Sequence, residues 1–289
     1  MKKYTTLSLL LIALTNVSFA QGIYFKIGGG YGLPIATSII GQQQTRNQDQ
    51  TGNNNTNIET TKNTSASFIA GANGNIGVGF MFSKYLGAEI TAQYVTGKTY
   101  KIYDVYNYKS DNLTGSQWDK SSVSCKAIYI NPSFIITPGP KLPYGRFGFI
   151  LGAPKIKEES SHYYDLDGTS TSSTKGELKN NLSVGFQGAL GMKWTLGNKI
   201  DLFTEVSVIS MTVYTKEYTL TESISNGTDN LAAMQTYYKK TVYKKEITVD
   251  NSASTDINKP RQAIRESNAF SSISLQVGIV YLLQKRNVE

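Results

Sequence analysis

The stretch that decides the fold reads FIAGANGNIGVGFMFS over residues 68–83, KY over residues 84–85 and LGAEITAQYVT over residues 86–96. In the first arm, even-numbered positions are almost all apolar and odd-numbered positions are mostly Gly, Asn or Ser. The second arm repeats this alternation, with Glu89 on its polar side. A period of two over this length predicts two β-strands. The short connection Ser83–Tyr85 predicts a tight hairpin between them.

Both arms are long for strands of a soluble protein. Ordinary strands have about five or six residues, whereas a strand that crosses a membrane needs about 9–11. The polar face consists of small and charged residues, so it cannot be the core of a soluble sandwich. A soluble lipocalin-like barrel is excluded because its inner face would be apolar. An apolar outer face and a polar inner face are typical of a transmembrane β-barrel.

Six further segments show the same alternation, which brings the expected total to eight strands. They cover residues 23–31, 128–136, 144–151, 182–194, 200–208 and 272–281. The connections alternate between short and long, and the long ones are rich in Asn, Gln, Ser and Thr; they cover residues 35–65, 104–119, 158–178 and 217–265. Such segments bury little apolar surface, so we expect mobile loops. The predicted fold is therefore all-β, an eight-stranded antiparallel up-and-down transmembrane β-barrel with long extracellular loops.

The amino terminus predicts export. Met1-Lys2-Lys3 precedes an apolar run and then Ser18-Phe19-Ala20, the pattern of a secretory signal peptide over residues 1–20, with cleavage between Ala20 and Gln21. Residues 21–289 would form the barrel domain, placed in the cell outer membrane. The formal charge is +8, and loss of Lys2 and Lys3 leaves 8 − 2 = +6. This charge is scattered and accompanies no nucleic-acid motif, so no nucleic-acid partner is expected.

With eight strands and four long loops, the chain resembles small outer-membrane barrels of the OmpA/OmpX type. The Tyr-rich loops are similar to those of Bacteroidetes-type outer-membrane barrels. The resemblance implies architecture more than function, since one fold serves many functions. Aromatic residues near the short turns are expected to form an interfacial girdle; they are Phe82, Tyr85, Tyr144, Trp194 and Tyr281.

Six charged residues are expected to point into the barrel, because they fall on the polar side of their strands. They are Lys26, Glu89, Arg146, Lys193, Asp201 and Glu205. One interpretation is a selectivity ring or proton path. The favoured interpretation is a plug of ion pairs, because eight strands leave room only for side chains. Within it, Glu89 and Glu205 are the expected partners of Arg146, whose planar fork suits carboxylates.

His162 is the candidate catalytic residue, and Cys125 is interpreted as a strand residue. His162, the only His, lies in the sequence Ser161-His162-Tyr163-Tyr164-Asp165, and some barrels of this size are rim hydrolases or acyltransferases with such a His. Adjacent residues of an extended chain point in opposite directions, so catalysis is the minor hypothesis. Cys125, the only Cys, has no disulfide partner and no ligand spacing around it. No metal or cofactor is expected.

The fourth long connection is the candidate ligand-binding segment. It interleaves aromatic and basic residues, namely Tyr237, Tyr238, Lys239, Lys240, Tyr243, Lys244 and Lys245. These could bind phosphates of lipopolysaccharide or an acidic glycan. A solvated hairpin is the favoured alternative, because residues 216–266 carry eight basic and seven acidic side chains.

The expected function is that of a non-enzymatic outer-membrane barrel with a structural, adhesive or accessory role in a surface complex. Outer-membrane lipid and lipopolysaccharide are its expected surroundings, and the loops are expected to offer a surface to a protein or glycan partner. A narrow channel and a rim hydrolase or acyltransferase that uses His162 remain the alternatives.

Overall fold

The computed structural model describes residues 22–53, 55–139, 142–165, 169–248 and 254–284. Its sixteen strands belong to one sheet, and nearly all of their pairings are antiparallel. One short helix, α2 (Thr236–Lys239), is present in this part of the chain. The all-β prediction is therefore confirmed. Among the described residues, no helix is long and apolar enough to cross a membrane.

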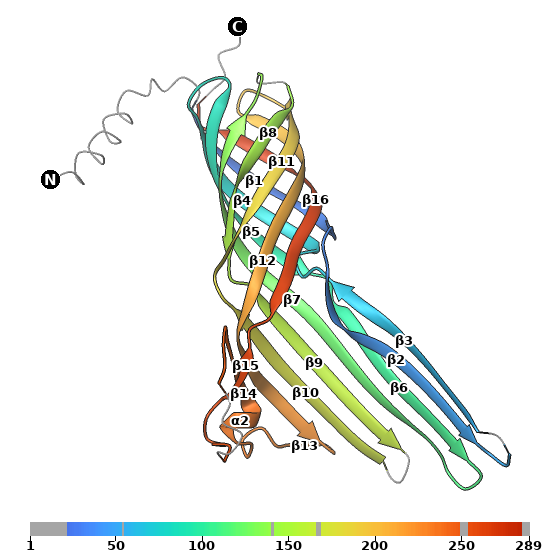
Figure 1. Ribbon diagram of the computed structural model, residues 1–289. Helices are drawn as coiled ribbons and strands as arrows, with labels where there is room; N and C mark the ends of the chain where they lie inside the picture. Colours follow the sequence, from blue (N-terminus) through green and yellow to red (C-terminus); the bar gives the residue numbers. More distant parts are fainter. Residues whose placement is uncertain (1–21, 54, 140–141, 166–168, 249–253, 285–289) are drawn as a thin grey trace.

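Half of the strands form a closed ring, in which each strand is antiparallel to both neighbours (Figure 1). In order around the ring they are β1 (Ile23–Pro34), β4 (Gly71–Met81), β5 (Leu86–Gly97), β7 (Thr114–Ile136), β8 (Tyr144–Gly152), β11 (Ser183–Thr195), β12 (Ile200–Ser225) and β16 (Ser267–Leu282). The ring closes because β16 pairs with both β12 and β1. These strands correspond to the eight that the alternation predicted, but the predicted total of eight is wrong.

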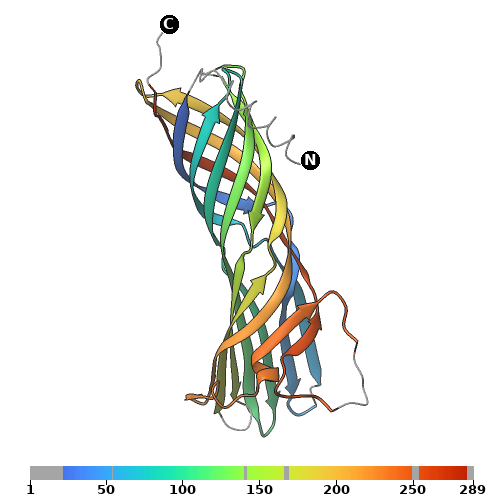
Figure 2. The same ribbon diagram turned by 90° about the vertical axis from the view of Figure 1, so that its left-hand side faces the viewer.

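The remaining strands form a projecting sheet that continues from one end of the ring (Figures 1 and 2). They are β2 (Ser38–Gln50), β3 (Thr56–Ala66), β6 (Tyr100–Ser110), β9 (Lys155–Asp165), β10 (Thr169–Asn180), β13 (Thr228–Asp229), β14 (Lys240–Lys244) and β15 (Arg261–Ile264). Pairing with β6, β9 and β10 extends β7 and β12 into this sheet. The segments 35–65, 104–119 and 158–178, which were predicted to be mobile loops, are thus largely strands, and that prediction is wrong for them. The fourth segment, 217–265, holds the end of β12 and the short elements β13, α2, β14 and β15, and its other described residues are irregular.

Polar side chains hold the projecting sheet together. Gln42 donates to Asn63 at 3.1 Å across β2 and β3, and Asn107 donates to Asn47 at 2.9 Å across β6 and β2. Both faces of these strands are largely polar, so the sequence shows no alternation of apolar and polar residues. Backbone pairing nevertheless satisfies the main-chain donors and acceptors. For this reason a composition that suggests a loop can form a regular ribbon.

The predicted short turns at 83–85 and 197–199 have the expected form. Phe82 N–H donates to the Leu86 carbonyl at 2.9 Å, and Leu196 N–H donates to the Ile200 carbonyl at 2.9 Å. Of the turn predicted over residues 138–143, positions 140–141 lie outside the described residues. So do the predicted signal peptide and its cleavage site at Ala20 and Gln21.

An apolar cluster fills the inside of the ring where the projecting sheet begins. Its aromatic members include Phe68 and Phe270, whose ring centroids lie 5.6 Å apart, and the buried Cys125 belongs to it. Phe68 was predicted to begin a strand, but β4 begins only at Gly71, and Phe68 lies in the preceding turn. The turn requires Gly71, which has φ +144°, and a Cβ there would meet the Thr96 carbonyl oxygen at 2.3 Å.

Candidate functional site

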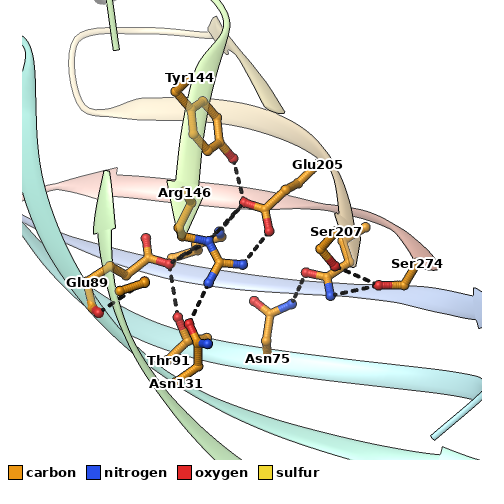
Figure 3. Close-up of polar contacts among 12 residues, drawn as sticks. Asn75, Glu89, Thr91, Asn131, Tyr144, Arg146, Glu205, Ser207 and Ser274 are labelled. Carbon is orange, nitrogen blue, oxygen red and sulfur yellow. Dashed lines mark hydrogen bonds and ion pairs between the residues drawn. The ribbon is translucent and has the colours of Figure 1, made fainter. Parts of the chain in front are cut away.

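Four of the six predicted interior charges meet inside the ring (Figure 3). Lys26 comes from β1, Glu89 from β5, Arg146 from β8 and Glu205 from β12. All four are buried, although they stand on strands whose other faces are exposed and apolar. We call these four residues the charge cluster.

Each carboxylate of the charge cluster contacts both cations. Arg146 donates from Nη2 to Glu205 Oε1 at 2.5 Å and from Nε to Glu205 Oε2 at 3.3 Å. Lys26 Nζ lies 3.0 Å from Glu205 Oε2 and 3.4 Å from Glu89 Oε1, and Arg146 Nε lies 3.7 Å from Glu89 Oε1. Glu205 therefore receives the two-pronged contact of Arg146. Two cations and two carboxylates balance, as a buried cluster requires.

Two buried tyrosines also donate hydrogen bonds to the carboxylates of the charge cluster. Tyr24 donates its hydroxyl to Glu89 Oε2 at 2.8 Å, and Tyr144 donates its hydroxyl to Glu205 Oε2 at 2.9 Å. The prediction that Tyr144 belongs to the interfacial girdle is wrong, because its side chain points inward and is buried. A signal was present, since each tyrosine stands two residues before a cation of the charge cluster, in Tyr24-Phe25-Lys26 and Tyr144-Gly145-Arg146. Residues two apart on a strand share a face.

Asn131 links the charge cluster to the backbone of the ring. Arg146 donates from Nη1 to Asn131 Oδ1 at 2.8 Å, and Asn131 donates from Nδ2 to the Phe149 carbonyl at 2.8 Å. The pairing of β7 with β8 is interrupted at Asn131 and Pro132, and Pro132 has no N–H to give. The Asn131 side-chain amide thus supplies a donor to β8 at this point. The register is the same on both sides of Pro132, so the proline causes no bulge.

Lys193 and Asp201 lie beside the charge cluster rather than in it. Lys193 Nζ is 4.9 Å from the ring centroid of Tyr24 and 5.1 Å from that of Tyr144, so this cation lies over both rings. Asp201 is buried on β12, on the same inward face as Glu205. Of the six charges predicted to point inward, four are therefore in direct contact with one another.

A chain of polar side chains lies next to the charge cluster inside the ring (Figure 3). Asn75 donates to Gln276 at 3.0 Å, Gln276 Nε2 lies 3.5 Å from Ser274 Oγ, and the Ser274 and Ser207 hydroxyls are 2.8 Å apart. The apolar cluster follows toward the projecting sheet. Charges, amides and apolar side chains therefore fill successive levels of the ring.

The residues of the predicted ligand segment are divided between two short elements. Tyr237, Tyr238 and Lys239 lie in α2, whereas Lys240, Tyr243 and Lys244 lie in β14, and Lys245 follows that strand. Lys240 Nζ lies 2.8 Å from Glu217 Oε2. This hydrogen bond from Lys240 is the main favourable cause that lowers the pKa of Glu217, against the opposing effect of burial. At least one of the predicted anion-binding lysines is therefore already paired.

His162 has a carboxylate partner that the sequence did not indicate. It lies on β9, and its Nδ1 contacts Asp119 Oδ1 on β7. The register places Ser172 of β10 on the other side of His162. The neighbours considered in the sequence, Ser161 and Asp165, are not the residues that β-pairing places opposite it. All three aligned residues lie on the projecting sheet, near the end farther from the ring.

Within the described residues, no group of three or more His, Cys, Asp or Glu side chains could hold a metal ion. No protein-family model and no curated protein matches the chain.

Proposed function

We propose that the ring is an integral outer-membrane β-barrel of the OmpA/OmpX type. Its lumen is closed by its own side chains, and its role is to hold the projecting sheet outside the cell for a structural or adhesive purpose. The observation that carries this proposal is the inverted surface of the ring. Large apolar side chains are exposed on its outside, and charged and amide side chains are buried on its inside.

The apolar outer surface extends around the whole ring. Its most exposed side chains come from different strands and include Ile27, Ile76, Ile90, Ile128, Phe149, Phe186, Leu190 and Leu275; Leu190 is 72% exposed. Soluble monomers rarely expose contiguous apolar patches of more than a few hundred Å². Each Å² left in water costs about 25 cal/mol. A hydrocarbon surrounding removes this cost, so the surface supports a membrane location.

Strand length and pairing support the same proposal. The shortest strand of the ring, β8, has nine residues, which agrees with the roughly 9–11 needed to cross a bilayer. A closed ring leaves no unpaired edge, and a lipid-exposed backbone must satisfy its hydrogen bonds internally. Short turns at one end and long excursions at the other match the asymmetry of outer-membrane barrels.

The filled interior supports a closed barrel rather than a channel. Four mutually paired charges, an amide chain and an apolar cluster occupy the ring. A barrel of eight strands has an interior that side chains can fill. In this proposal the charge cluster stabilises the barrel, and no solute passes through it.

Two measurements test the proposal. In cell fractions, the protein should sediment with outer membranes and migrate faster on a gel unheated than boiled; recovery as a soluble periplasmic protein would contradict the barrel. In planar bilayers, wild type should show little steady conductance, and Glu89→Ala should show more. Glu59→Ala, which removes a carboxylate from the projecting sheet, should leave the conductance at the wild-type level. A large stable pore in wild type would favour the channel.

The contact between His162 and Asp119 supports a second candidate function, a hydrolase whose active site lies on the projecting sheet. The carboxylate could orient the imidazole, and the register pairs His162 with Ser172 of β10, which carries a hydroxyl. A broad panel of ester, amide and glycoside substrates tests it. Activity lost in both His162→Ala and Asp119→Asn would establish the hydrolase; inactivity of the wild type would remove it.

A further inference from the structure

An aromatic row crosses one face of the projecting sheet. Trp118 of β7 faces Val105 of β6 on one side and Tyr163 of β9 on the other. The rings of Trp118 and Tyr163 are stacked, with centroids 5.5 Å apart and planes inclined by 15°. Tyr103 lies on the same face, opposite Lys120, in the next row. We call Tyr103, Val105, Trp118 and Tyr163 the aromatic platform.

The aromatic platform is held in place before any ligand arrives. Tyr163 donates its hydroxyl to Asp165 Oδ2 at 3.1 Å, which fixes the ring that stacks on Trp118. Lys120 Nζ lies 5.7 Å from the Tyr103 ring centroid. Rings that are already ordered lose little freedom on binding, so they favour association.

Polar side chains surround the aromatic platform on all sides. In the cross-strand register, Asn107 and Ser116 form the row on one side of it, and Lys120 and Ser161 belong to the row on the other. Thr45 of β2 and Thr171 of β10 continue the central row at its two ends. An open, shallow depression of about 320 Å³ is lined by Tyr103, Val105, Asn107, Ser116, Trp118 and Lys120. That volume lies at the small end of ligand-binding pockets.

Neither a bilayer nor a large protein surface explains this composition. Trp118 lies ten residues along β7 from Ile128, the nearest strongly exposed apolar residue of the ring on that strand. At about 3.3 Å per residue the separation is roughly 33 Å along the strand, too far for an interfacial aromatic residue. The platform is also a narrow strip bordered by hydroxyl and amide groups, whereas a protein interface needs an apolar core wide enough to exclude water.

We propose that the aromatic platform binds a pyranose ring of a glycan. A pyranose has a face of C–H groups, which carry slight positive charge and suit the negative face of an aromatic ring. Its edge carries hydroxyls. Asn107 and Ser116 can donate hydrogen bonds to these hydroxyls or accept from them, and Lys120 can donate to them. The inference rests on the proposed function only for access to sugars outside the cell, because binding itself does not require the membrane.

The two tryptophans of the chain allow a direct measurement. Trp194 lies on the ring, so Trp194→Phe leaves Trp118 as the single fluorescent reporter on the platform. The purified full-length protein is kept in lauryldimethylamine oxide, because detergents with sugar head groups would compete. It is titrated with maltohexaose, cellohexaose, chitohexaose and mannohexaose. At least one of these oligosaccharides should shift the Trp118 emission in a saturable way.

Calorimetry with the responding sugar tests whether stacking is responsible. Trp118→Ala should weaken binding at least about tenfold, as loss of one stacked ring does in other ring-stacking sites. Trp118→Phe should restore part of the affinity, and Trp194→Ala should leave it unchanged. Failure of all four oligosaccharides at millimolar concentration would overturn the proposal, as would undiminished binding by Trp118→Ala. A switch from dimer to monomer in Trp118→Ala without sugar binding would identify a self-association surface instead. Because the readout is in detergent solution, failure here leaves the membrane location untouched.

Discussion

The ring and the projecting sheet share two strands, yet they expose different kinds of side chain. On β7, every second residue points outward along its whole length. In the ring this outward series includes Ile128 and Phe134, whereas in the projecting sheet it includes Ser116 and Lys120. The opposite series of β7 differs too, because Asn131 is buried in the ring whereas Gln117 and Asp119 are only partly buried in the projecting sheet. The comparison teaches that one continuous strand can carry an apolar outer face in one region and a mostly polar face in the other without a change of backbone geometry.

Breaking an Arg–Glu ion pair should give the largest difference in stability loss between the two regions. Glu205→Ala leaves Arg146 and Lys26 with one carboxylate inside the ring, so we expect a loss of about 3–5 kcal/mol in the free energy of unfolding. Glu59→Ala removes the partner of Arg46 on the projecting sheet, where both side chains are nearly half exposed. It should cost about 0–1 kcal/mol. Urea unfolding in lipid vesicles measures both, and equal losses would contradict a buried charge cluster.

Placing a charge on the outer face should change the free energy of unfolding differently in the two regions, but by less than loss of Glu205 does. Ile90 lies on the ring and is 57% exposed, and Ile58 lies on the projecting sheet and is 58% exposed. In a soluble protein, Arg at either position would be nearly neutral. If the ring spans a membrane, Ile90→Arg should cost about 2–4 kcal/mol, whereas Ile58→Arg should stay within about 0.5 kcal/mol. The amount of protein in outer membranes that migrates faster unheated than boiled measures the same difference between the two variants. Equal amounts for both variants would argue against a lipid surrounding.

The smallest effect is expected from pH on the projecting sheet. The hydrogen bond from Lys240 lowers the pKa of Glu217, so the pair stabilises the sheet above the ordinary Glu pKa of about 4.3. This contribution is lost as the pH falls through the lower pKa of the folded state. Glu217→Gln should therefore cost at most about 1 kcal/mol at pH 7 and nothing near pH 2. Local unfolding followed by Trp118 fluorescence measures it, with the exposed Glu246→Gln as control; a larger cost at low pH would reverse the assigned sign.

The ring was largely predictable because its two sides differ in polarity. The parity of Lys26, Glu89, Arg146 and Glu205 placed them inside, and the short hairpin turns fixed the register of neighbouring strands. Tyr24 and Tyr144 were not assigned to the charge cluster, since a tyrosine is equally common at a membrane interface. The role of Asn131 depends on its pairing with β8, which its own strand cannot reveal.

The projecting sheet was not predictable for a physical reason. Gln42–Gln44 in β2 and Thr60–Lys62 in β3 have polar residues on both faces, so alternation carries no information there. The parallel pairing of β2 with β6 also joins segments far apart in sequence. His162 and Trp118 found their partners, Asp119 and Tyr163, only through this long-range pairing of β7 with β9.

The length of β12 gives the molecule a mechanical property. This strand runs for 26 residues, and its first part pairs with β16 in the ring while its later part pairs with β10 in the projecting sheet. At about 3.3 Å per residue it is roughly 86 Å long. A force applied to the far tip of the projecting sheet would pass along this unbroken strand into the ring. There it would load many inter-strand hydrogen bonds in shear at the same time.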